Sequence, residues 1–185
     1  MIRAGALVAV ASVAAVLIGN STVAEVRAVQ SDSMVPTLAP GERVVVVKAG
    51  FDRWEVPLGT VVVFDAADLW ADARDPAGSV FVKRVVGVGG DRIRCCTDGG
   101  LLIRNGQPMV EPYLEGAPSD QQEFDVVVKP DHYWLLGDNR AGSADSRAHL
   151  GDPGGGNVPA SRIIGPVEAV VWPPGSIRRL EGPDE

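Results

Sequence analysis

The feature that most constrains this chain is an uninterrupted stretch without charged residues at positions 4–24. As an α-helix these residues would extend about 31 Å, close to the hydrocarbon thickness of a bilayer. Arg3 and the amino terminus supply the positive flank, which predicts a cytoplasmic N-terminus and an exported remainder. We therefore expect residues 1–24 to form a single-pass anchor in the plasma membrane. The small residues at 22–24 leave a second interpretation open, a cleavable leader, and both interpretations export the rest of the chain.

The remainder of the sequence is typical of a β protein built from short strands. Valine-rich or alternating runs predict strands at 43–48, 60–64, 80–88, 92–96, 101–104, 107–110, 124–128, 133–136 and 162–172. Asn105-Gly106 suits the tight turn of a hairpin, and no helix is expected after the anchor. We predict a mostly β fold: an antiparallel catalytic domain at 25–180, a small inserted β-hairpin subdomain at about 96–126, and a tail at 181–185.

The composition excludes several classes of function. A net charge of -7 argues against a nucleic-acid partner, which would require a basic face. The two histidines lie far from the two cysteines, so no metal site and no cofactor are expected. Cys95 and Cys96 are adjacent, and we expect two strand residues that point to opposite faces. A vicinal disulfide, formed on the oxidising side of a membrane, is the alternative.

The first candidate site is the segment Ser31-Asp32-Ser33-Met34-Val35-Pro36-Thr37-Leu38. A serine hydroxyl is a poor nucleophile until a neighbouring base takes its proton. On composition alone a histidine base is open, because His132 and His149 both lie near polar loops. The plain alternative is that Ser31 and Ser33 only cap a turn.

The second candidate is Lys83, one of only three lysines, inside the run Phe81-Val82-Lys83-Arg84-Val85. Strand alternation places Lys83 on one face with Phe81 and Val85, and Arg84 on the other. Burial disfavours the charged ammonium, and lowering a lysine pKa from ~10.4 to about 8 needs roughly 3 kcal/mol. The plain alternative is an edge-strand lysine with its amine in water.

The third candidate is the polar loop Gly137-Asp138-Asn139-Arg140-Ala141-Gly142-Ser143-Ala144-Asp145-Ser146-Arg147. This loop is either a solvated turn or a buried network. In the second interpretation its two aspartates and two arginines, Asp138, Arg140, Asp145 and Arg147, pair and fix the loop against the site.

Taken in this order, the three segments resemble type I signal peptidases, the serine–lysine proteases that remove signal peptides from exported preproteins. The resemblance extends from the anchor to the closing segment at 158–165. It implies Ser33 as the nucleophile and Lys83 as the general base. It also implies that the Ser31 hydroxyl and the Ser33 N–H form the oxyanion hole, and that Ser143 orients the lysine amine. The histidines match nothing catalytic in the pattern, so the triad interpretation is dropped.

The resemblance also implies the supporting residues and the partners. Asp138, Arg140, Asp145 and Arg147 match a structural acid–arginine network, and Met34 and Pro36 match the substrate pocket. The implied substrates are signal peptides of the Ala-x-Ala type, cleaved without a cofactor.

The position of Ser33 relative to the anchor predicts where the reaction takes place. Nine residues separate Ala24 from Ser33, and even fully extended they span roughly 30 Å. The site should therefore lie close to the outer surface of the lipid bilayer. Phe51, Trp54 and Trp70 are candidates to enter that interface, although ordinary packing in the core is the favoured interpretation.

Two rival functions are weighed against this one. A self-cleaving repressor of similar fold is opposed by the anchor and by the lack of a DNA-binding domain. An anchored, inactive binding module is not required, because both residues of the catalytic pair are present. The oligomeric state is left open.

Overall fold

The computed structural model describes residues 23–70, 79–114 and 122–180. The predicted anchor therefore lies outside the described residues, apart from its last two. Of these, Ala24 is the first residue of strand β1 (Ala24–Ala28), so the predicted end of the anchor is wrong at this position. No helix within the three described ranges is long and apolar enough to cross a membrane. The tail at 181–185 also lies outside them.

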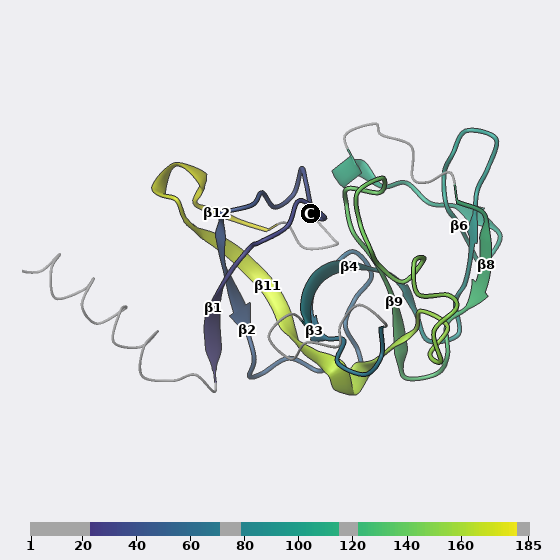
Figure 1. Ribbon diagram of the computed structural model, residues 1–185, viewed down its shortest axis with the longest axis horizontal. Coiled ribbons are helices and arrows are strands. Elements are labelled where there is room, and N and C mark those ends of the chain that lie inside the picture. The colour runs from purple at the N-terminus through teal and green to yellow at the C-terminus, as the bar shows by residue number, and fades with distance from the viewer. Residues whose placement is uncertain (1–22, 71–78, 115–121, 181–185) are drawn as a thin grey trace, which may run out of the picture.

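An antiparallel sheet of eight strands forms the larger part of the molecule, in the order β1-β2-β11-β3-β4-β9-β10 with β12 paired to β11. Its other strands are β2 (Arg43–Val47), β3 (Val61–Asp65), β4 (Val80–Val88), β9 (His132–Leu136), β10 (Val158–Pro159), β11 (Ile163–Trp172) and β12 (Arg178–Arg179). Figure 1 shows the sheet curling from β1 and β2 across β11 to β3, β4 and β9. The curl brings the loop between β1 and β2 close to the middle of β4, although about fifty residues separate them.

The curl depends on β11, the long strand that changes partners along its length. Its first half pairs with β3 and its second half with β2, with a register shift in each pairing. Gly165 lies where the pairing changes, and a Cβ there would lie 1.9 Å from the carbonyl oxygen of Val47. Only a residue without a side chain allows two backbones to approach so closely.

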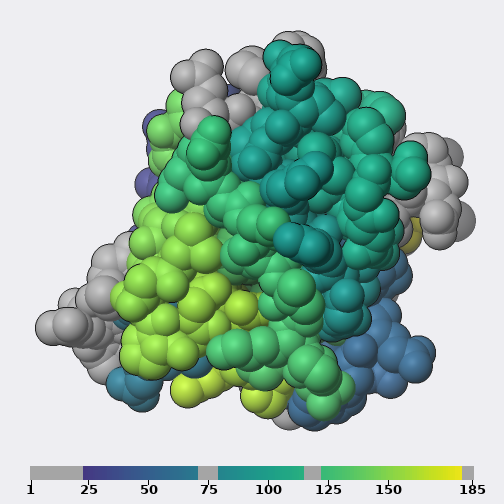
Figure 2. Space-filling model, turned by 90° about the vertical axis from the view of Figure 1, so that its right-hand side faces the viewer, coloured from purple at the N-terminus to yellow at the C-terminus, as the bar shows by residue number. Residues whose placement is uncertain are grey.

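A second antiparallel sheet has the order β7-β6-β5-β8. Its strands are β5 (Arg92–Cys95), β6 (Ile103–Arg104), β7 (Gln107–Pro108) and β8 (Phe124–Val127), and the short 3-10 helix η2 (Pro112–Leu114) follows β7. The predicted subdomain at 96–126 therefore starts too late, because β5 already belongs to this sheet. Figure 2 shows this region, in teal and green, over the upper part of the face that is drawn.

Three buried clusters form the core. One lies beneath β1, β2 and β11, and a second lies between β3, β4 and β9. The third joins the second sheet to the first through Val86, Ile93, Phe124, Trp134 and Leu136. Burial of these side chains fixes the second sheet against β4 and β9, which carry residues of the candidate site.

One expectation about individual residues is wrong, and the packing interpretation of Trp70 is confirmed. Cys95 and Cys96 form a vicinal disulfide, because β5 ends at Cys95 and the strand alternation that would separate the two side chains stops there. Trp70 is 2% exposed and stacks on His149 with ring centroids 4.2 Å apart, so it belongs to the core. Phe51 is partly buried against the same cluster, and Trp54 is exposed.

Candidate active site

The loop at 29–42, between β1 and β2, carries Ser33. Val29 and Glu42 close its base through a backbone hydrogen bond of 2.8 Å from the Val29 N–H to the Glu42 carbonyl. Met34 and Leu38 fix the loop to the core, since both side chains are buried beneath β1, β2 and β11. Because Ser33 directly precedes the buried Met34, its position follows from the packing of the loop.

Two further contacts hold this loop from outside. Arg178, on β12, donates hydrogen bonds to both carboxylate oxygens of Glu42, at 2.7 and 3.0 Å, and to the carbonyl oxygen of Thr37, at 2.7 Å. The hydrogen bond from Arg178 holds the pKa of Glu42 below its usual value. Strand β12 therefore holds the loop that bears Ser33 through the hydrogen bonds of Arg178.

The central pair of the site is Ser33 and Lys83. Lys83 Nζ lies 2.8 Å from Ser33 Oγ, and the two residues are 2% and 7% exposed respectively. The lysine amine also lies 5.8 Å from the centroid of the Phe81 ring, as strand alternation predicted. Such burial disfavours the charged ammonium, and a general base requires the neutral amine.

Ser31 and Ser143 take different positions around this pair. Ser31 Oγ lies 3.1 Å from Ser33 Oγ on the exposed side, a position suited to the predicted oxyanion-hole role. Ser143 Oγ is buried but has no hydrogen-bond partner among the described residues. The Ser143 hydroxyl lies against Gly137, and its role in orienting the Lys83 amine stays a prediction.

The loop at 137–143 presses directly on Ser33. The Asn139 backbone N–H donates to the Ser33 carbonyl at 3.1 Å, and the Asn139 side chain donates to the Asp32 carbonyl at 3.3 Å. A Cβ on Gly137 would lie 2.4 Å from the Ser33 carbonyl oxygen. The second loop therefore fixes the backbone of the proposed nucleophile.

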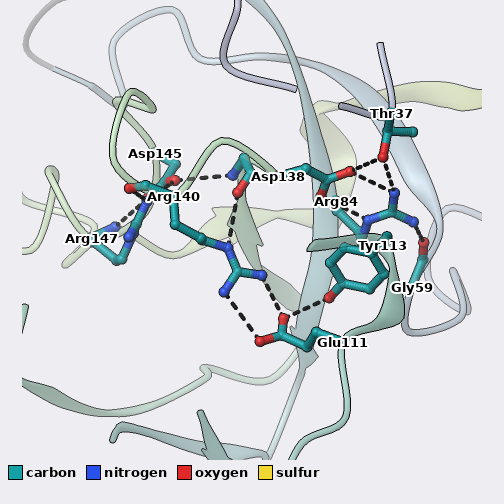
Figure 3. A network of polar contacts seen from close by, with 10 residues as sticks. Thr37, Gly59, Arg84, Glu111, Tyr113, Asp138, Arg140, Asp145 and Arg147 are labelled. Carbon is teal, nitrogen blue, oxygen red and sulfur yellow. Dashed lines mark hydrogen bonds and ion pairs between the residues drawn. The ribbon is translucent and has the colours of Figure 1, made fainter. Parts of the chain in front are cut away.

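Three buried arginine–carboxylate pairs surround this loop (Figure 3). They pair Arg84 with Asp138 at 2.6 Å, Arg140 with Glu111 at 2.5 Å, and Arg147 with Asp145 at 2.7 Å. Asp145 also accepts a hydrogen bond from the Gly137 N–H at 3.0 Å. The predicted buried network exists, but among the ion pairs of the described residues only that of Arg147 and Asp145 joins two of the predicted residues.

Sequence reasoning missed three members of this network: Arg84, Glu111 and Tyr113. Arg84 was expected on the face opposite Lys83, and it does lie there, where it also donates to the carbonyl oxygen of Gly59. Its guanidinium carbon lies 3.9 Å from the centroid of the Tyr113 ring. The opposite charges of Arg84 and Asp138 were the one sequence feature that could have predicted a role for Arg84. No local sequence pattern marks Glu111 or Tyr113.

The histidines are engaged elsewhere. His149 Nδ1 lies 2.8 Å from Asp152 Oδ2, and His132 Nδ1 lies 2.6 Å from the carbonyl oxygen of Pro130. Of the predicted pocket residues, Pro36 is exposed, whereas Met34 is 1% exposed within the core. A hollow of about 580 Å³ does exist, lined by residues 54–58, 88–90 and 130–133, but it includes neither residue.

A buried serine hydroxyl within hydrogen-bond reach of a buried lysine amine is the arrangement of a serine hydrolase that uses an amine as its base. The model of the family described as signal peptidase, peptidase S26, matches residues 1–172. This chain belongs to that family and is a serine endopeptidase.

Two relatives found by sequence agree with this assignment. The chain is 34% identical over 216 residues to the signal peptidase I of Mycobacterium tuberculosis (strain CDC 1551 / Oshkosh), covering 94% of this chain and 73% of that protein. It is 33% identical over 161 residues to the signal peptidase I of Leptolyngbya laminosa, covering 87% and 75%. A solved signal peptidase I from Enterococcus faecalis V583 has a TM-score of 0.46 and 23% identity, covering 60% of this chain and 96% of that one.

Proposed function

We propose that this peptidase removes signal peptides from exported preproteins, with Ser33 as the nucleophile and Lys83 as the general base. The observation that carries the residue assignment is the 2.8 Å separation of Lys83 Nζ and Ser33 Oγ, with both residues buried. Membership of the signal peptidase family supports the substrate class.

The reaction follows from these positions. The neutral amine of Lys83 accepts the Ser33 proton, and Ser33 Oγ attacks the carbonyl carbon at the end of the signal peptide. The Ser31 hydroxyl and the Ser33 N–H stabilise the oxyanion, a contribution worth ~3–4 kcal/mol of barrier for a preorganised donor. The leaving amine takes its proton from Lys83. A water molecule activated by the same amine then hydrolyses the acyl-enzyme.

The proposal includes the side of the membrane on which cleavage takes place. The segment that precedes β1 anchors the chain in the plasma membrane with the N-terminus in the cytoplasm, so cleavage takes place on the extracytoplasmic side. Between this anchor and Ser33 lie only β1 and the first residues of the loop at 29–42. Because this connection is short, the site stays close to the membrane surface, where the cleavage sites of translocated preproteins emerge.

The substrates carry small residues of the Ala-x-Ala type before the cleaved bond. Pro36, on the exposed side of the Ser33 loop, and Met34 beneath it are proposed as parts of the substrate pocket. The Met34 side chain contributes by shaping the loop from within the core.

Cleavage of a synthetic preprotein by the detergent-solubilised enzyme tests the assignment. Ser33→Ala and Lys83→Ala should each lower kcat by more than about 10³-fold, since either residue alone leaves no activated nucleophile. Lys129→Ala is the matched control, because this lysine is exposed and its amine donates to the Gly154 carbonyl, away from Ser33. Cleavage by Ser33→Ala at the parent rate would refute the assignment, as would parent-level cleavage by Lys83→Ala.

A further inference from the structure

The segment that follows β7 extends from the second sheet into the buried network around Ser33 (Figure 3). We propose that two of its residues, Glu111 and Tyr113, are positioning residues for the peptidase reaction, holding the loop at 137–143 against Ser33. This inference rests on the proposed role of Ser33 as nucleophile.

Glu111 acts through Arg140. The Arg140 guanidinium donates to both oxygens of Glu111, at 2.5 and 3.2 Å, and its Nε donates to the Gly137 carbonyl at 2.9 Å. Gly137 is the residue that lies against the Ser33 carbonyl. A continuous series of direct contacts therefore runs from the second sheet through Arg140 and Gly137 to Ser33.

The charge of Glu111 is what allows Arg140 to hold this position. Both side chains are almost fully buried, at 2% and 4% exposure. Burial works to lower the pKa of Arg140, but the hydrogen bond and the charge of Glu111 outweigh it and raise the pKa. Without the carboxylate, Arg140 would be a buried charge with its ion pair broken, which favours movement of the guanidinium toward water.

Tyr113 acts on the other arginine. Its hydroxyl donates to Glu111 at 2.6 Å, and its ring lies against the Arg84 guanidinium at 3.9 Å. Burial, together with the charge of Glu111 and the hydrogen bond to it, raises the pKa of Tyr113, so the phenol remains a donor. Arg84 in turn grips both carboxylate oxygens of Asp138, the neighbour of Gly137. Two residues of one short segment therefore support two adjacent positions, Gly137 and Asp138, of the loop at 137–143.

This arrangement predicts an effect on catalysis rather than on substrate affinity. Glu111 and Tyr113 contact neither Ser33 nor Lys83 in any hydrogen bond of the described chain. Their loss would loosen the Ser33 backbone relative to the lysine amine while leaving the exposed side of the loop in place. Because small misplacements of reacting groups are costly, kcat should fall and KM should change little.

The test compares Glu111→Gln and Tyr113→Leu with two matched controls in the full chain. Both variants should lower kcat for preprotein cleavage by roughly 10- to 100-fold, with KM within about threefold of the parent value. Glu123→Gln removes an exposed glutamate just before β8. Tyr133→Phe removes a phenol that is bonded to Val56 and Arg53 instead, and it should lower the unfolding temperature without lowering kcat.

A graded variant keeps the test decisive if Tyr113→Leu does not fold. Tyr113→Phe retains the ring over Arg84 and loses only the hydrogen bond to Glu111, so its kcat should fall between those of the parent and Glu111→Gln. The inference is overturned if Glu111→Gln and Tyr113→Phe both cleave at the parent kcat while unfolding at lower temperature. Full loss of cleavage in Ser33→Ala, measured alongside, ensures that such a result counts against the positioning role alone.

Discussion

Substitution of Gly137 by alanine gives the most direct measure of how tightly the two loops of the site are fitted. The added Cβ would lie 2.4 Å from the Ser33 carbonyl oxygen and 2.2 Å from Ser143 Oγ. Ordinary contacts begin at 3.4 Å, so the Ser33 carbonyl and the substituted residue must separate by 3.4 minus 2.4, or about 1 Å. Neither can move freely. Met34, the residue after Ser33, is buried in the core, and Asp138, the residue after Gly137, is buried and accepts a hydrogen bond from Arg84.

The expected cost follows from that displacement. A shift of about 1 Å between reacting groups lowers a rate by about 100-fold, and overpacking of this kind costs about 1–3 kcal/mol of stability. Steady-state cleavage of a synthetic preprotein should show the loss in kcat, and urea unfolding should show the lower stability. Gly151→Ala is the matched control, since a Cβ there meets nothing within 4 Å.

A double variant separates the two collisions. Ser143→Gly in the Gly137→Ala background removes both Ser143 atoms that the new Cβ would meet, Oγ at 2.2 Å and Cβ at 2.6 Å, but leaves the contact with the Ser33 carbonyl. The single Ser143→Gly variant is the reference for the double variant. If displacement of the nucleophile causes the loss, kcat should remain low in the double variant. Cleavage by Gly137→Ala within about threefold of the parent would refute the reasoning, because the loops would then be free to separate without effect.

Three further predictions concern the contacts of Arg178 with the Ser33 loop and the groups that titrate. Arg178→Ala should lower the free energy of unfolding by about 1–2 kcal/mol in urea, since Glu42 and the Thr37 carbonyl lose their donor, whereas Arg179→Ala on the same strand should not. The pKa of Glu42 is held below 4.5, so its pairing stabilises the fold above that pH and is lost as pH falls through the lowered value. Glu42→Gln should therefore flatten the acid limb of a thermal-unfolding profile, and an unchanged limb would contradict the pairing. Finally, kcat should rise with pH as the amine of Lys83 loses its proton, and a pH–rate profile that peaks below neutrality would contradict a lysine base.

The acid–arginine network illustrates where prediction from local pattern stops. The sequence leaves burial and solvation of the loop at 137–147 equally open, and the structure buries its two aspartates and two arginines while residues 141, 142 and 144 are exposed. Its residues were expected to pair with one another, but Asp138 and Arg140 pair with Arg84 and Glu111, which are 54 and 29 residues away in the chain. Spacing along the chain carries no information about such partners, because the curl of the sheet brings them together.

What the sequence determined by itself are the features that depend on neighbours in the chain. The alternation of side chains in 80–88 sets β4 and places Lys83 beside Phe81, and the order of three motifs identifies Ser33 and Lys83 as a pair. The strand β1, the disulfide at the end of β5, and the position of Ser143 over Gly137 were decided only by the tertiary structure. Strand propensity and alternation act over a few residues, whereas the partner of a buried charge or hydroxyl depends on which distant segments the folded sheet brings into contact.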